Sequence, residues 1–319
     1  MTWLLTGGAG YIGAHVARAL LDAGRAVVVL DDLSTGAAER VPPGVALVAA
    51  PVQDADALAA TLADHDVRGV IHLAAKKAVG ESVERPVWYF RENVDGMLSL
   101  LEAMDRAGVD RLVLSSSAAV YGTPEGGDVD EDAPTRPESP YGRTKLACEW
   151  LAADVARARG LRHVDLRYFN VAGAGRPELG DTGVFNLIPL VLRALTTGRP
   201  PQVFGADYPT PDGTCIRDYI HVADLAEAHV AAVAALEADG PSRTYNVGRG
   251  EGASVLEVID AVRSVTGLDV APEVVGRRAG DPARVVARAD RIRAELGWTA
   301  RHDLADMVAS AWEAWPARP

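Results

Sequence analysis

The 319-residue sequence predicts an α/β fold in which a doubly wound parallel sheet is followed by a smaller C-terminal α/β domain. Short apolar runs alternate with amphipathic stretches through the first half of the chain, which is typical of a parallel sheet covered by helices on both faces. A glycine-rich turn separates the first apolar run from the first amphipathic stretch. Beyond Asn170 the alternation gives way to loops rich in glycine and proline.

The spacing at which apolar residues recur predicts the helices and strands in chain order. Strands are expected at Trp3–Leu5, Ala26–Leu30, Val45–Ala49, Val70–Ala74, Arg111–Ser115 and His163–Tyr168. Helices are expected at Ile12–Ala23, Ala55–Ala63, Val87–Ala107, Tyr141–Arg159, Asn186–Thr196, Val222–Glu237 and Val255–Val265. We therefore expect a nucleotide-binding domain over residues 1–170 and a second domain over residues 171–319, with some later segments returning to the first.

Composition argues against several classes of partner. The net charge of −12 repels phosphate backbones, so we expect no nucleic-acid partner. No apolar run reaches the ~18 residues of a membrane helix, and the chain opens on an apolar strand without a basic leader, so we expect no membrane partner. The two cysteines imply no disulfide framework and fit a reducing cytoplasm. The seven histidines show no metal-ligand spacing, so no metal is expected.

The glycine-rich turn has the spacing of a dinucleotide-binding turn. It contains Gly8-x-Gly10-x-x-Gly13 and also Gly7-x-x-Gly10-x-x-Gly13, between a predicted strand and a predicted helix. Glycines there permit a tight turn and let backbone N–H groups approach a pyrophosphate at the helix N-terminus. The first domain is therefore predicted to be Rossmann-like.

An acidic residue selects the form of the dinucleotide. Asp31 ends the second predicted strand, where a carboxylate accepts hydrogen bonds from the adenosine ribose and repels a 2′-phosphate. No arginine or lysine follows it before Arg40. The sequence therefore favours NAD over NADP.

Tyr141 and Lys145 lie four residues apart on a predicted helix, and so on one face of it. An adjacent ammonium favours the phenolate, so Lys145 is expected to lower the pKa of Tyr141 and make it a base for an alcohol proton. Lysine is rare in this chain, which has only Lys76, Lys77 and Lys145. Serines 115–117 end the fifth predicted strand, at the edge where ligands bind in parallel sheets. They either bind a sugar oxygen or merely satisfy a turn.

Over nearly the whole chain these motifs resemble the extended short-chain dehydrogenase/reductase family. Within that family the chain is most similar to the epimerases that act on C4 of UDP-hexoses. The matching stretches are Thr6–Gly13, Lys77–Ser82, Ser115–Gly122, Ser139–Lys145, Arg167–Asn170 and Asp207–Val222. The first and the fourth stretch are shared across the superfamily, whereas the last is more specific to the epimerases.

The resemblance implies a role for each matching residue. It makes Tyr141 the catalytic base, Lys145 its partner and Ser117 a hydroxyl that helps to hold the sugar. The residues implied to bind NAD are Gly7, Gly10, Tyr11, Ile12, Gly13, Asp31, Lys77, Asn93, Tyr141, Lys145 and Tyr168. Those implied to bind the nucleotide-sugar are Ser117, Tyr141, Asn170, Asn186, Phe204, Arg217, Arg278 and Asp281. Residues 1–170 then form the NAD-binding domain and residues 171–319 the UDP-sugar-binding domain.

The implied activity is NAD-dependent inversion of the C4 hydroxyl of a UDP-hexose through a transient 4-keto intermediate. Dehydration is disfavoured, because the related dehydratases carry an Asp-Glu pair where this chain has Ala118 and Ala119. A UDP-glucuronate epimerase or decarboxylase stays open as an alternative, since it shares the oxidation step. An NAD-binding regulator without catalysis would have no need of Tyr141, Lys145 and Ser117 together.

Two positions depart from the family pattern. Pro51 falls where an aspartate usually contacts adenine, and either the Val52 amide or Asp54 is expected to compensate. Val285 replaces a tyrosine that crowds the sugar 2-position in some relatives, so UDP-GlcNAc and UDP-GalNAc are expected as additional substrates. Family members commonly dimerise through two helices, which predicts a homodimer formed by the regions 87–107 and 141–159.

Overall fold

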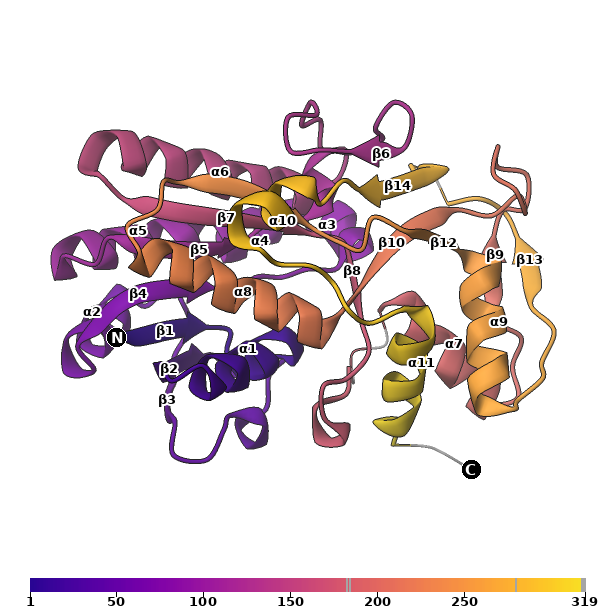
Figure 1. Cartoon of the computed structure of the whole chain (residues 1–319), viewed down its shortest axis with the longest axis horizontal. Helices are drawn as coiled ribbons and strands as arrows, with labels where there is room; N and C mark the ends of the chain where they lie inside the picture. The colour runs from indigo at the N-terminus through magenta and orange to yellow at the C-terminus, as the bar shows by residue number, and fades with distance from the viewer. Residues whose placement is uncertain (182, 184, 279, 317–319) are drawn as a thin grey trace. The chain divides into compact units, whose positions relative to one another are not determined.

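The computed structural model describes residues 1–181, 183, 185–278 and 280–316. The chain forms two compact units, each built from separate segments (Figure 1). The first unit contains residues 1–122, 135–167 and 226–245, and the second contains residues 123–134, 168–225 and 246–319. Residues 226–245 thus belong to the first unit although they lie between two segments of the second in the sequence.

A seven-stranded sheet forms the centre of the first unit, in the strand order β11-β7-β5-β4-β1-β2-β3. From β7 to β3 every neighbouring pair is parallel. This arrangement confirms the predicted fold class. The strands are β1 (Thr2–Thr6), β2 (Ala26–Asp31), β3 (Ala46–Ala49), β4 (Val67–His72), β5 (Arg111–Ser115), β7 (Arg162–Tyr168) and β11 (Arg243–Val247).

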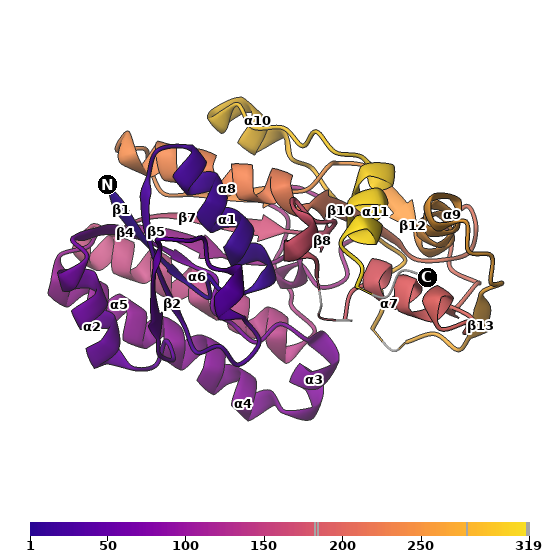
Figure 2. The same ribbon diagram turned by 90° about the horizontal axis from the view of Figure 1, so that it is seen from below.

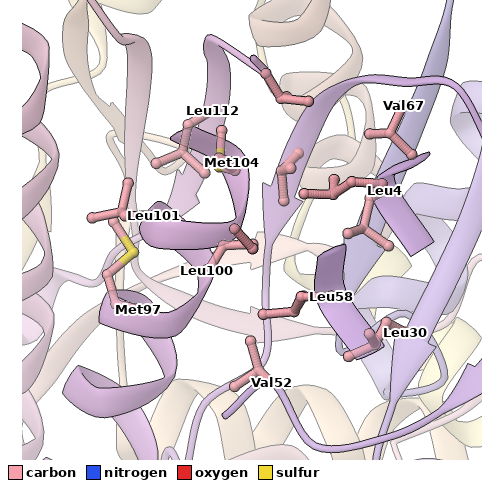
Figure 3. Packing of buried hydrophobic residues seen from close by; sticks show 14 of the residues in the cluster. Leu4, Leu30, Val52, Leu58, Val67, Met97, Leu100, Leu101, Met104 and Leu112 are labelled. Atoms are coloured by element: carbon pink, nitrogen blue, oxygen red, sulfur yellow. The ribbon is translucent and has the colours of Figure 1, made fainter. Parts of the chain in front are cut away.

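Helices cover both faces of this sheet (Figure 2). They are α1 (Tyr11–Asp22), α2 (Ala55–Asp64), α3 (Val79–Glu84), α4 (Pro86–Phe90), α5 (Gly96–Ala107), α6 (Pro140–Arg159) and α8 (Val222–Glu237). Successive side chains of a strand point to opposite faces. Leu4 accordingly packs with Leu58 and Leu100 in the core shared with α2 and α5 (Figure 3). Trp3 faces the other way, and its Nε1 donates to Glu237 Oε1 of α8 at 3.0 Å.

The helical region predicted over residues 87–107 is confirmed, but it is not a regular α-helix throughout. α4 ends at Phe90, a π-helical turn follows over Arg91–Asp95, and α5 begins at Gly96. π turns insert an extra residue into a helix and occur frequently at functional sites. This one carries the buried side chain of Asn93. Hydrophobic period cannot reveal such an insertion, because the apolar face continues across it.

The second unit contains short strands and four longer helices. One sheet has the order β12-β10-β14-β6, with β8 paired to β10, and β9 pairs with β13. Its strands are β6 (Asp128–Val129), β8 (Asn170–Ala172), β9 (Gln202–Phe204), β10 (Ile216–His221), β12 (Gly252–Ser254), β13 (Glu273–Val275) and β14 (Arg284–Ala287). Its helices are α7 (Leu187–Thr196), α9 (Val255–Thr266), α10 (Asp290–Leu296) and α11 (Leu304–Glu313). Leu192, Val258 and Met307 form a core between α7, α9 and α11.

Among the described residues, no helix is both long and apolar enough to cross a bilayer.

Candidate active site

A tight turn joins β1 to α1 through the predicted glycine run. Gly7 has a left-handed φ of 75°, and its N–H donates to the carbonyl oxygen of Leu30 at 2.9 Å. A Cβ atom on Gly7 would lie 2.7 Å from the backbone nitrogen of Ala74, and one on Gly13 would lie 2.3 Å from the carbonyl oxygen of Gly7. Both positions therefore require glycine, as the close approach of a pyrophosphate to the turn also would.

The N-terminus of α1 is open to an anion. Gly10 caps the helix with an extended backbone, and no side chain caps the first turn. The N–H groups at the start of a helix have no intrahelical acceptor, and the helix dipole favours negative charge there. The turn therefore fits the diphosphate of a dinucleotide, with Tyr11, Ile12 and Gly13 as the residues predicted to bind it.

Asp31 lies at the carboxyl end of β2 with both carboxylate oxygens held by backbone groups. Oδ2 accepts the N–H of Ala9 at 2.9 Å, and Oδ1 accepts the N–H of Leu33 at 2.8 Å. Leu33 has a φ of 56°, unusual for a branched residue, in the turn that brings its N–H to Asp31. Each oxygen keeps a further lone pair, which fits the predicted contact with ribose hydroxyls. Burial raises the pKa of Asp31, and the two backbone hydrogen bonds partly oppose it.

The structure also brings a lysine to this edge of the sheet. Lys76 Nζ donates to Ser34 Oγ at 2.9 Å, and its charge opposes the effect of burial on the pKa of Asp31. Sequence reasoning missed this cation because only the residues directly following Asp31 were considered, and Lys76 comes from the loop after β4.

Asn93 holds the loop that carries Lys77. The Asn93 amide accepts the Lys76 N–H at 2.8 Å and donates to the Lys76 carbonyl at 3.0 Å. It also donates to Thr144 Oγ1 of α6 at 2.9 Å, a partner that the motifs did not predict. Lys77 itself is exposed. Asn93 thus positions the backbone beside the predicted NAD contact, and its own contact with the cofactor ribose stays a prediction.

Tyr141 and Ser117 meet at the start of α6. The Tyr141 phenol is buried, and the Ser117 hydroxyl lies close enough to it to oppose, in part, the rise in its pKa that burial causes. Ser139 caps the helix by accepting the Gly142 N–H at 3.1 Å. A Cβ atom on Gly142 would lie 2.5 Å from the carbonyl oxygen of Ala119, so a glycine lets α6 approach the loop that follows β5. This close approach brings the two predicted catalytic side chains together.

Lys145 lies one turn further along α6. Its Nζ donates to the carbonyl oxygen of Ser115 at 2.8 Å, and the residue is only 4% exposed. The expected lowering of the pKa of Tyr141 by Lys145 is wrong, because burial raises that pKa and the group that partly lowers it is the Ser117 hydroxyl. Burial also lowers the pKa of Lys145, opposed by the neighbouring Cys148 and Glu149.

In the second unit two of the predicted substrate residues form a pair. Arg217 of β10 and Asp281 lie with Nη2 and Oδ1 3.5 Å apart. Arg217 Nη1 also donates to the carbonyl oxygen of Pro282 at 2.7 Å, which fixes the guanidinium. Arg217 stands in register with Val285 of the parallel strand β14.

A second pair in this unit is formed by Phe204 of β9 and Arg278. The Arg278 guanidinium carbon lies 3.6 Å from the centre of the Phe204 ring, a cation–π contact. Asn186 precedes α7, and its side chain donates to Asp181 Oδ2 at 2.9 Å. Tyr168 ends β7, and Asn170 begins β8 with an exposed side chain.

Val285 and the residues that follow Pro51 lie in packed or hydrogen-bonded surroundings. Asp54 caps α2 by accepting the Ala57 N–H at 3.0 Å, so its carboxylate is engaged in the helix cap. The Val52 side chain is buried in the core shown in Figure 3. Val285 is also buried.

In the described part of the chain, no group of three or more His, Cys, Asp or Glu side chains is arranged to hold a metal ion.

The glycine turn, the buried phenol, the half-buried Ser117 hydroxyl and the buried ammonium all belong to the first unit. This combination defines a dinucleotide-binding α/β enzyme. Residues 3–248 match the NAD dependent epimerase/dehydratase family, and the chain belongs to that family. Membership confirms the resemblance seen in the motifs and confirms NAD as the cofactor.

Known relatives agree over almost the full length. The UDP-glucose 4-epimerase of Azospirillum brasilense is 50% identical over 317 residues, covering 97% of this chain and 91% of the relative. The crystal structure of UDP-glucose-4-epimerase from Stenotrophomonas maltophila, with bound NAD and formylated UDP-arabinopyranose, is 44% identical with a TM-score of 0.93, covering 98% of this chain and 97% of that one. The UDP-Glc/GlcNAc 4-epimerase of Campylobacter jejuni is 36% identical with a TM-score of 0.86, and 98% of each chain is covered.

Proposed function

We propose that this chain interconverts UDP-glucose and UDP-galactose by inverting the hydroxyl at C4 of the hexose. The observation that carries the proposal is the buried Tyr141 phenol, beside the Ser117 hydroxyl and one helical turn from Lys145, whose ammonium is held by the Ser115 carbonyl oxygen. The full-length relatives with UDP-glucose 4-epimerase activity support the choice of sugar.

The three side chains divide the proton chemistry between them. Tyr141, as the phenolate, takes the proton of the C4 hydroxyl and later returns it. Ser117 holds the same sugar oxygen by a hydrogen bond. Lys145 keeps its ammonium beside them through its hydrogen bond to the Ser115 carbonyl oxygen. The chemistry that NAD supplies when bound is reversible acceptance of the C4 hydride, so that the sugar passes through a 4-keto form and no net oxidation occurs.

The first unit is the proposed NAD-binding domain. The diphosphate is held by the turn and the first helical N–H groups, and Asp31 binds the adenosine ribose. The full set of proposed NAD contacts is Gly7, Gly10, Tyr11, Ile12, Gly13, Asp31, Lys77, Asn93, Tyr141, Lys145 and Tyr168. Tyr168 falls just beyond the first unit, whereas the others lie within it.

The second unit is the proposed UDP-sugar-binding domain. Arg217 and Arg278 suit the substrate diphosphate, because the planar guanidinium binds phosphate oxygens with two parallel hydrogen bonds. Phe204 offers a ring face to uracil, and Asp281 offers a carboxylate to the uridine ribose. Asn170 and Asn186 are the remaining proposed contacts. Anchoring through UDP leaves the hexose free to turn its other face to the cofactor between the two hydride transfers.

Dehydration, the other activity in the family description, is disfavoured. It needs an acid and a base to remove water across C5 and C6 after the C4 oxidation. The segment that follows Ser117 is the short helical turn Ala118–Val120, which has no ionisable side chain. A UDP-glucuronate epimerase or decarboxylase shares the oxidation step and is the alternative that the assay below separates.

The substrate range is proposed to include UDP-GlcNAc and UDP-GalNAc. Val285 is smaller than the tyrosine that crowds the sugar 2-position in some relatives, and it stands in register with Arg217. The similarity to a UDP-Glc/GlcNAc 4-epimerase supports this range.

The protein is proposed to act as a cytoplasmic homodimer. Val87 of α4 and Trp150 of α6 are 65% and 62% exposed. Further large apolar side chains are exposed on α3, α4 and α5, namely Val79, Val83, Phe90 and Leu98. A surface of this kind on one group of helices is typical of an interface with a second copy. Both cysteines are free and buried, which fits a reducing compartment.

The decisive experiment incubates the purified protein, without added NAD, with UDP-glucose, UDP-GlcNAc and UDP-glucuronate separately in D2O. We expect UDP-galactose from the first and UDP-GalNAc from the second, with no deuterium at C4, because the hydride that leaves C4 returns to it. Deuterium at C4 would rule out the hydride route. Conversion or decarboxylation of UDP-glucuronate alone would establish the alternative function.

A further inference from the structure

A buried ion pair lies next to Lys145, on the face of α6 that carries Tyr141. Glu149 follows Lys145 by four residues on α6, and so lies on the same face of the helix as Tyr141 and Lys145. Arg167 of β7 donates to it through two parallel hydrogen bonds, Nε to Oε1 at 2.9 Å and Nη2 to Oε2 at 2.6 Å. Both side chains are less than 10% exposed.

The same carboxylate holds the serine segment. Ser116 Oγ donates to Glu149 Oε1, and the Ser116 N–H donates to the carbonyl oxygen of Leu166 at 2.9 Å. The residue before it, Ser115, accepts the Lys145 ammonium through its carbonyl oxygen, and the residue after it, Ser117, binds the Tyr141 phenol. Glu149 is therefore bonded to the central residue of the segment that contacts both members of the tyrosine–lysine pair.

Arg167 extends the network beyond this segment. Its Nη1 donates to the Tyr121 hydroxyl at 3.0 Å, and its guanidinium carbon lies 5.0 Å from the centre of the Tyr121 ring. Tyr121 follows the short helical turn that begins after Ser117. The ion pair thus holds the chain on both sides of Ser117.

Stability alone does not account for this arrangement. Replacing a buried ion pair by apolar residues of similar volume is often neutral or stabilising, because desolvation of both charges offsets their attraction. A role in placing charged and polar groups is a better reason for a buried carboxylate beside the site, since an active site depends on supporting residues that lock its geometry.

We propose that Glu149 is a positioning residue for the C4 chemistry, one that sets the spacing of the Ser117 hydroxyl, the Tyr141 phenol and the Lys145 ammonium by holding Ser116. The inference rests on the proposed function, because it concerns the same three side chains. A second effect follows from its charge: Glu149 opposes the lowering of the pKa of Lys145 by burial, and so helps to keep the ammonium protonated.

Several other groups act on these two side chains. Arg167, Asp165 and His163 of β7 interact with Glu149, and His72 of β4 and Cys148 of α6 interact with Lys145. Tyr89 of α4 interacts with Tyr141. Of the neighbours named here, Glu149 alone has carboxylate oxygens bonded to both the serine segment and Arg167.

The test uses three variants of the NAD-loaded enzyme. Glu149→Gln keeps the shape and an acceptor but removes the charge, and Ser116→Ala removes only the link to the serine segment. Glu237→Gln is the matched control, since Glu237 pairs with Arg25 at 3.0 Å elsewhere in the first unit. For Glu149→Gln we expect kcat to fall roughly 10- to 100-fold, the size of effect that small misplacements at a site produce, with KM changed by less than about threefold. In the profile of kcat against pH of Glu149→Gln, the alkaline limb should move to lower pH, because Lys145 then loses its proton more easily.

Ser116→Ala separates position from charge. It should lower kcat by about tenfold with the alkaline limb unmoved, because the carboxylate is still present. Glu237→Gln should keep the wild-type kcat and pH profile. Wild-type kcat and pH profile in folded Glu149→Gln would overturn the proposal. If that variant does not fold, an unchanged kcat in Ser116→Ala would overturn it equally. Failure of the wild type to convert any UDP-hexose would instead sink the proposed function.

Discussion

The Lys145 ammonium on α6 donates a 2.8 Å hydrogen bond to the backbone carbonyl of Ser115, the last residue of β5. An ammonium has three donors, and this bond uses one of them. The bond fixes the charge at the end of the strand beside Ser117, whose hydroxyl contacts Tyr141. The cation is thus anchored to backbone, and its two other donors are available to a phenolate and a cofactor hydroxyl.

Lys145→Arg should lose at least about 100-fold in kcat although it keeps the charge. The guanidinium is planar and larger than an ammonium. Because the Lys145 side chain is buried, the guanidinium cannot occupy the place of the ammonium. Steady-state kinetics with UDP-galactose measure the loss. NAD content and melting temperature are measured in parallel, so that loss of the cofactor or of the fold is separated from loss of turnover. Full activity would show that charge alone suffices.

Tyr141→Phe should retain the fold, bound NAD and affinity for UDP, but lose turnover by about 100- to 10,000-fold, the usual range for a general base. The ring stays in its buried position and only the phenol oxygen is removed. Product analysis after long incubation, with calorimetric titration of UDP as the binding control, checks the prediction. Turnover within a few-fold of the wild type would exclude Tyr141 as the base.

Ser117→Ala should move the acid limb of the kcat profile to higher pH. Burial raises the pKa of Tyr141, and the Ser117 hydroxyl lowers it in part. Without that hydroxyl the pKa of the phenol rises further, so less phenolate is present at a given pH and more alkaline solution restores it. Because the pKa of a free phenol is already about 10, the limb is measured from kcat up to about pH 11. A limb that stays in place would show that Ser117 does not act on the phenol.

His72 should make the fold less stable in mild acid. Burial and the nearby Lys145 lower its pKa from 6.5 to about 3, so the folded state holds the ring neutral while the unfolded chain protonates below pH 6.5. Stability from this group is present above pH 6.5 and decreases as the pH falls toward 3, by about 2 kcal/mol between pH 7.5 and pH 5.

The control for this prediction is His72→Asn, which keeps an amide near Thr6 Oγ1, the atom that lies 2.8 Å from His72 Nδ1. Urea unfolding gives the free energy of unfolding at pH 7.5 and at pH 5. The decrease between the two should be about 2 kcal/mol smaller in this variant than in the wild type. An equal decrease in both proteins would assign the acid sensitivity to other groups.

The combined change Val87→Glu and Trp150→Glu should convert the proposed dimer to a monomer. Both side chains are exposed and apolar in the chain, and a carboxylate inside an interface has to be desolvated. Light scattering should give about twice the chain mass of 33.6 kDa for the wild type and the single-chain mass for the variant. A wild-type protein that is monomeric at micromolar concentration would contradict the assignment.

The fold class could be predicted from sequence, and the tyrosine–lysine pair proposed as catalytic could be found, because both rest on local signals. The turn at Gly7–Gly13 lies within seven consecutive residues, and Tyr141 and Lys145 lie one helical turn apart. The strands of the first unit are long enough for their apolar character to appear. The strands of the second unit, such as β8 and β12, have only three residues and leave no period to detect.

The parts that sequence reasoning missed depend on contacts between distant segments. Lys76 reaches Ser34 across 42 positions, and Asn93 reaches Thr144 across 51. The direction of the pKa shift of Tyr141 was wrong because burial of the phenol cannot be judged from the spacing of two residues. Glu149 could have been singled out from the sequence, since its spacing from Lys145 repeats that of Lys145 from Tyr141. Its proposed positioning role becomes visible only from its contacts with Arg167 and Ser116.

The interleaved order of segments has a consequence for synthesis. Trp3 of β1 donates to Glu237, which is translated 234 residues later. Completion of the first unit has to wait for residues 226–245, and by then residues 168–225 of the second have also emerged. No single cut in the chain releases either unit whole. We therefore expect that neither unit can be expressed as a separate fragment of the chain.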